Sequence, residues 1–129
     1  MTQGTLAPRE RELVILRIAA QMRSQYELAH HSSLARMVGL TASEVVALSQ
    51  PLDRHAWGDT DLQLLAFVDE LYSLEDVSDQ TWRMLEDRFA PAELMELIFL
   101  VCFYRTLATF VRAVRIQLDE NAGVAPRDR

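Results

Sequence analysis

A glutamate and a histidine four residues apart are the side chains best suited to chemistry in this sequence. On a helix, Glu27 and His31 would be neighbours on one face, close enough to hydrogen-bond. A carboxylate beside an imidazole orients the ring, and such a pair suits general acid–base catalysis. The spacing of Ser24 and Glu27 also fits a structural interpretation, because it is that of a capping box at a helix start. The residues alone leave both interpretations open.

Glu12 and two arginines are further candidates. Glu12 lies at the start of the first predicted helix, where a carboxylate stabilises the helix dipole. A functional role requires that a tight turn at residues 23–24 fold the second helix back toward it. Arg105 and Arg112 lie seven residues apart on the last predicted helix. They are candidates to bind a substrate carboxylate, and salt bridges to a partner subunit are the alternative.

The sequence argues against a metal site and against thiol chemistry. His30 and His31 are adjacent, so they cannot share a helical face, and no third ligand stands at helical spacing; we therefore predict no zinc site. The single cysteine, Cys102, excludes an internal disulfide and a redox pair. Because it lies within the apolar stretch IFLVCF, we expect a buried, inert thiol.

Length and charge narrow the class of protein. The chain has 129 residues, the size of a single domain, with a formal net charge of −6. An acidic chain lacks the basic footprint of a nucleic-acid-binding protein. The longest apolar run, residues 97–104, is too short to cross a membrane, and the N-terminus has no apolar signal segment. We expect a cytoplasmic protein that binds neither nucleic acid nor membrane.

Apolar residues recur at helical spacing along the whole chain, which predicts an all-α fold of about six helices. A helix from Pro8, apolar nearly all round at residues 13–20, should be central. The predicted second helix ends at Gly39, the third begins after Thr41, and residues 51–59 form a loop. Three more predicted helices cover about 60–74, the residues after Ser78, and 91 to about 119, leaving a frayed tail at 121–129.

Several segments together resemble the carboxymuconolactone decarboxylase family, whose helical fold is shared with AhpD-like alkylhydroperoxidases. The likeness spans about residues 4–120, as one domain, and includes GTLAPRERELVILRIA, YELAHHSSLARMVGLTASEV and LIFLVCFYRTLATFVRAVRIQLDE. Redox members carry a glutamate, then C-x-x-C-x-x-x-H, then a glycine eight residues past the histidine. Here His31 and Gly39 keep that spacing, while Ser24 and Glu27 stand where the cysteines would be.

The resemblance therefore favours the decarboxylases, which lack the cysteines and carry a glutamate four residues before the histidine. It implies that His31 is the general acid–base, Glu27 its orienting carboxylate and Glu12 a second proton-transfer group. It also implies an arginine such as Arg105 or Arg112 as carboxylate anchor, no cofactor, and a homotrimer or homohexamer with the site near a subunit boundary.

We therefore expect a cofactor-independent decarboxylase-like enzyme acting on a small carboxylated lactone or similar enolisable acid. One alternative is a non-catalytic small-molecule-binding or assembly module of the same fold. A thiol peroxidase is disfavoured, because a dithiol mechanism needs a nucleophilic thiolate and a resolving partner.

Overall fold

Six helices and no strand make up residues 6–116, the part of the chain that the computed structural model describes. They are α1 (Pro8–Gln21), α2 (Gln25–Met37), α3 (Ala42–Ala47), α4 (Asp59–Leu74), α5 (Asp79–Glu86) and α6 (Pro91–Val114). The predicted all-α fold is confirmed. The predicted frayed tail at 121–129 lies outside the described residues.

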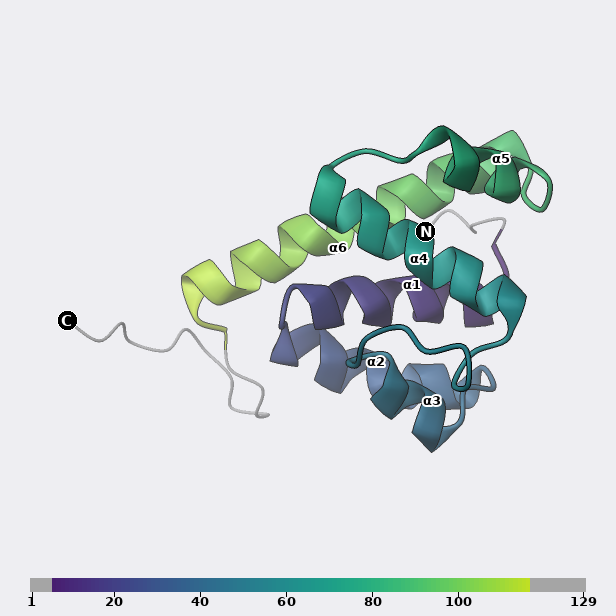
Figure 1. Cartoon of the computed structure of the whole chain (residues 1–129). Helices are drawn as coiled ribbons and strands as arrows, with labels where there is room; N and C mark the ends of the chain where they lie inside the picture. Colours follow the sequence, from purple (N-terminus) through teal and green to yellow (C-terminus); the bar gives the residue numbers. More distant parts are fainter. Residues whose placement is uncertain (1–5, 117–129) are drawn as a thin grey trace.

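α1 is the central helix, as its sequence predicts. It packs against α2, α4 and α6, and lies between the α2–α3 pair and the α4–α5–α6 group (Figure 1). All seven residues from Leu13 to Ala19 are buried, including the charged Arg17. A helix that is apolar on every side has no solvent face, so it must be surrounded.

Two short turns fold α2 onto this central helix and α3 onto α2. Arg23 turns the chain with φ +54°, and Ser24 is the N-cap of α2. Gly39, with φ +106°, follows the end of α2 in the left-handed region that glycine tolerates. Thr41 and Glu44 form the predicted capping box of α3. The turn at residues 23–24 makes α1 and α2 an antiparallel hairpin.

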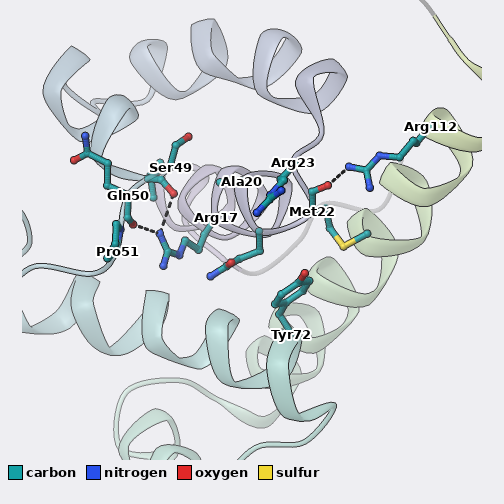
Figure 2. Close-up of a pocket in the computed structure, with 11 residues that line it drawn as sticks. Arg17, Ala20, Met22, Arg23, Ser49, Gln50, Pro51, Tyr72 and Arg112 are labelled. Atoms are coloured by element: carbon teal, nitrogen blue, oxygen red, sulfur yellow. Dashed lines mark hydrogen bonds between the residues drawn. The ribbon is translucent and has the colours of Figure 1, made fainter.

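Arg17 binds both α4 and the segment that follows α3, and Figure 2 shows the second of these contacts. Its Nε and one terminal nitrogen donate to the two carboxylate oxygens of Asp69 on α4, at 2.7 and 2.6 Å. The other terminal nitrogen donates to the carbonyls of Leu48 and Gln50, at 2.9 and 2.7 Å. The buried charge is therefore paired and hydrogen-bonded, as burial requires.

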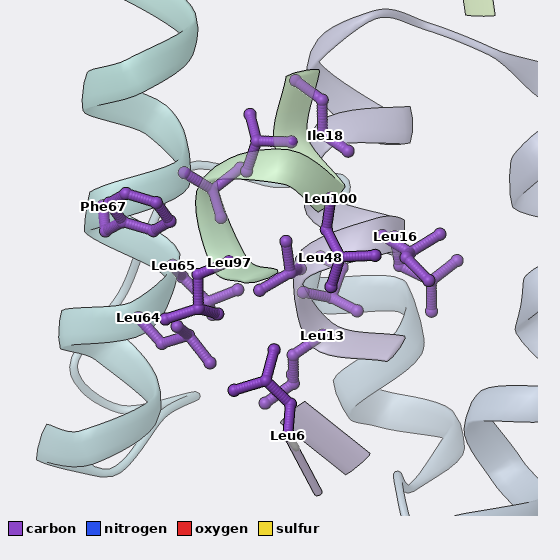
Figure 3. Close-up of a cluster of buried hydrophobic side chains, with 14 of the residues drawn as sticks. Leu6, Leu13, Leu16, Ile18, Leu48, Leu64, Leu65, Phe67, Leu97 and Leu100 are labelled. Atoms are coloured by element: carbon purple, nitrogen blue, oxygen red, sulfur yellow. The ribbon is translucent and has the colours of Figure 1, made fainter. Parts of the chain in front are cut away.

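The apolar core lies where α1, α4 and α6 meet (Figure 3). Leu13 and Leu16 of α1 pack in one cluster with Leu64 and Phe67 of α4 and Leu97 of α6, all almost fully buried. The periodicity of α4 predicts a buried side of Leu62, Leu65, Ala66, Val68, Leu71 and Tyr72. Leu65 and Val68 are fully buried and Leu62, Leu71 and Tyr72 pack against the core, while Leu64 and Phe67 are buried as well.

α6 buries one side and exposes an apolar row on the other. Its mean hydropathy is 1.8 over 18 residues, so by length and composition alone it could cross a membrane. The core helix of a soluble protein meets the same criterion, so this is weak evidence for a membrane span. The outward side carries large apolar side chains, which we call the α6 stripe: Met95, Phe99, Phe103 and Phe110.

Two predictions for α6 are wrong. The helix ends at Val114 rather than near Asp119, with Arg115 in the left-handed conformation. Cys102 is exposed rather than buried. An apolar run that surrounds a helix cannot face one core on every side, and Cys102 lies seven residues after Met95, on the outward face.

Candidate active site

The centre of the candidate site is a contact between Glu12 of α1 and His31 of α2. An Oε2 atom of Glu12 lies 2.9 Å from Nδ1 of His31, although the residues are nineteen positions apart. Both side chains keep a small exposed fraction, 13% for Glu12 and 16% for His31. The hairpin turn at residues 23–24 thus brings Glu12 to the second helix, as its functional interpretation requires.

Glu27 lies in the same region but does not hydrogen-bond to His31. Its Oε2 atom accepts from the Ser24 hydroxyl, and its Oε1 atom is buried without a hydrogen-bond partner in the described chain. Helical side chains lean toward the N-terminus of their helix, so the Glu27 carboxylate reaches back to Ser24 and away from His31. The carboxylate that contacts the His31 ring is therefore that of Glu12, not of Glu27 as the resemblance implied. Ser24 also donates to a side chain instead of capping the helix backbone.

Tyr104 of α6 is a member of the site that the sequence analysis missed. Its ring meets the His31 ring edge to face, with 5.4 Å between centroids. Burial and the negative charges of Glu12 and Glu27 raise the pKa of its phenol above the usual 10.0, against the opposing charge of Arg11. Tyr104 follows the buried Leu97 by seven residues and Val101 by three, so its place on the inward face of α6 was a usable signal.

The two predicted substrate arginines lie elsewhere. Arg105 donates to the carbonyl of Tyr72, 3.1 Å away, and pairs loosely with Glu75 on the α4 side of α6. Arg112 donates to the carbonyl of Met22, at the C-terminal end of α1. Met22 is ten residues from Glu12, or about 15 Å along the helix axis. Neither arginine is brought next to His31 within one chain.

The arrangement is suited to proton transfer. A carboxylate, an imidazole and a phenol come together from three different helices, with the second carboxylate of Glu27 buried nearby. Within residues 6–116, no group of three or more histidine, cysteine or acidic side chains could hold a metal ion. Glu12, Glu27 and His31 line none of three surface pockets of residues 6–116, which lie at the end of α1, between the α1–α2 turn and α6, and between α4 and α6.

The family's sequence profile decides what kind of protein carries this site. The profile of the carboxymuconolactone decarboxylase family matches residues 1–70, more than half of the chain. The chain belongs to the carboxymuconolactone decarboxylase family. The matched segment holds Glu12, Glu27 and His31, whereas Tyr104 and both predicted substrate arginines lie beyond it.

Solved structures share the fold of this family member. One is a protein of unknown function from Agrobacterium tumefaciens whose description links it to antioxidant defence and AhpD. It is 18% identical, with a TM-score of 0.81 over 89% of this chain and 80% of that chain. Another is an uncharacterized peroxidase-related protein from Silicibacter sp. TM1040. It is 14% identical, with a TM-score of 0.76 over 92% of this chain and 63% of that chain. The search of curated proteins finds no significant match. At these identities the two structures establish the AhpD-like helical fold.

Proposed function

We propose that the chain is a cofactor-independent decarboxylase-like enzyme that moves protons through His31. The observation that carries the proposal is the 2.9 Å contact between Glu12 and His31, whose ring also contacts Tyr104. A carboxylate, an imidazole and a phenol in contact at a partly exposed position form a general acid–base constellation. The substrate class is a small carboxylated lactone or a similar enolisable acid, in keeping with the family.

The proposed chemistry needs only proton movement. Loss of carbon dioxide leaves the electron pair of the broken C–C bond in the unsaturated lactone as a dienolate. That dienolate then takes a proton at carbon. An ionised Glu12 only accepts hydrogen bonds, so Nδ1 of His31 keeps one proton, and the imidazolium form of the ring gives its second proton from Nε2 to the dienolate carbon. His31 regains its proton from solvent, and the neutral Tyr104 phenol can donate a hydrogen bond to the developing oxyanion.

We propose that a second copy of the chain covers the site. Aromatic rings run from the α6 stripe to the site: Phe99 stacks on Phe103, Phe103 meets Tyr104, and Tyr104 meets His31. Large apolar side chains that lie together on an exposed helix surface are typical of a protein–protein interface. A homotrimer or homohexamer that covers the stripe would turn the partly exposed site into an enclosed one.

The decisive experiment follows the ultraviolet decay of carboxymuconolactone and of simpler carboxylated butenolides. His31→Ala is compared with His30→Ala, a matched control because His30 is exposed on a different helix face, against Tyr26. We expect His31→Ala to lose about 100-fold or more of kcat, the usual contribution of a general acid–base, and His30→Ala to keep the wild-type rate. Glu12→Gln should lower kcat more than it changes KM.

Equal rates in the two histidine variants would exclude the acid–base role of His31. Turnover of none of these compounds by the folded wild type would instead favour a non-catalytic small-molecule-binding or assembly module. One observation supports that second candidate: Glu27, although central to the family motif, is buried, and its free oxygen is out of contact with solvent.

A further inference from the structure

A pocket of about 530 Å³ lies at the C-terminal end of α1, away from the Glu12–His31 contact. We call it the arginine pocket. Its walls come from the α1–α2 turn, the segment after α3, Tyr72 of α4 and Arg112 of α6 (Figure 2). The α1 residues that line it run from Arg17 to Met22, about 8 to 15 Å from Glu12 along the helix axis. A ligand bound there would be distinct from the substrate of the proposed reaction.

Positive charge gathers around this pocket, although the chain as a whole is acidic. The chain is acidic, and five arginines in the described part pair with carboxylates: Arg9, Arg11, Arg17, Arg88 and Arg105. Arg23 and Arg112 have no carboxylate partner within residues 6–116, and both line the arginine pocket. Both also line an adjoining pocket together with Arg115, which is equally unpaired there. Among residues 6–116, no acidic side chain lines either pocket.

Arg23 and Arg112 are both held beside the pocket by the turn between α1 and α2. Arg23 has φ +54°, a conformation that is costly for a residue with a side chain and that clusters at functional sites. Arg112 donates to the Met22 carbonyl, which holds it beside the same turn and leaves other N–H groups free. Two positively charged groups on a concave surface concentrate the field that attracts an anion.

We propose that the arginine pocket binds a small organic anion, a carboxylate or a phosphate attached to an apolar body. The guanidinium groups of Arg23 and Arg112 bind the anionic group, because their planar forks match carboxylate and phosphate oxygens. Tyr72, Met22 and Pro51 supply apolar surface for the body of the ligand. Arg17 is not an anion ligand, since Asp69 neutralises its charge.

The test measures binding to the full chain by titration calorimetry with benzoate, phenyl phosphate and the neutral analogue benzamide. Arg23→Gln and Arg112→Gln are compared with Arg83→Gln, which removes an exposed, unpaired arginine of α5 and so changes the net charge equally. We expect saturable binding of an anion but not of benzamide, weakened about tenfold or more in the two pocket variants and unchanged in the control. The tighter of the two anions identifies carboxylate or phosphate as the preferred group.

Three results would overturn the proposal: no saturable binding of either anion, equal binding of benzamide, or the same loss in Arg83→Gln. Arg112→Gln also removes a hydrogen bond to the backbone, so its thermal unfolding is measured alongside. Arg23 donates no such bond in the described chain, and its variant therefore tests the pocket even if Arg112→Gln is unstable. The proposal is independent of turnover, because these titrations need no reaction at His31.

Discussion

Tyr104 keeps a phenol beside two carboxylates in a half-buried place, where its ionisation is unfavourable. Its pKa lies above 10.0 in the folded chain, so the folded state holds its proton more tightly than the unfolded state. Stability from this group is therefore complete below pH 10 and is lost as the pH rises through the folded pKa. We expect Tyr104→Phe to lose less stability than the wild type between pH 9 and pH 11. Urea unfolding at several pH values in this range measures the free energy of unfolding, with Tyr26→Phe as the control. A difference in free energy between wild type and Tyr104→Phe that stays constant from pH 9 to pH 11 would contradict the prediction.

The sequence predicts that Glu12 and His31 lie near each other, but not how the polar atoms of the site pair. Glu12 and His31 follow from their family spacing and from the turn that joins their helices. The Glu27 carboxylate points toward Ser24, and the spacing of the residues alone does not predict this direction. Tyr104 is more than seventy positions from His31, and only the packing of α6 on the α1–α2 hairpin brings it there.

Arg17 and Arg9 show how two ion pairs between the same helices differ. Both join α1 to α4, but the Arg17 side chain is 5% exposed and that of Arg9 is 34% exposed. Arg17→Ala leaves Asp69 without its charged partner, with the Gln21 amide still donating to it, and leaves two backbone carbonyls without their donor. We therefore expect a loss of about 3–5 kcal/mol in the free energy of unfolding. Arg9→Ala should cost about 1 kcal/mol or less. Urea unfolding at neutral pH measures the free energy of unfolding of both variants. Equal losses would show that burial does not determine how much each ion pair stabilises the fold.

Element boundaries are predictable where a residue has a local reason to stop a helix. Pro8 and Pro91 begin helices, the Thr41–Glu44 box begins another, and Gly39 follows the end of α2, all as predicted. The end of α6 has no such signal, because the sequence after Val114 contains no glycine or proline before Gly123. Its predicted end near Asp119 was accordingly too late.

For the whole molecule, the apolar excess of the sequence is divided between a core and a surface. α1, which is apolar nearly all round over residues 13–20, takes the centre, and α6 then has only one side left to bury. Periodicity could not predict that Cys102 would be on the other side, since residues 97–104 are apolar all round. The exposed row is accounted for if the functional unit contains more than one copy.

The α6 stripe therefore provides the test of assembly. Phe99 is 63% exposed, so Phe99→Arg should leave the fold intact while placing a charge in the proposed interface. Val46→Arg is the control, because Val46 is 60% exposed on α3, on the other side of α1 from α6 (Figure 1). Sedimentation should give a trimer or hexamer for the wild type and Val46→Arg, and smaller species for Phe99→Arg. A wild-type mass of 14.7 kDa in solution would contradict the proposed assembly. If a second copy also closes the site, Phe99→Arg will lose turnover together with assembly, since the ring path from Phe99 ends at His31.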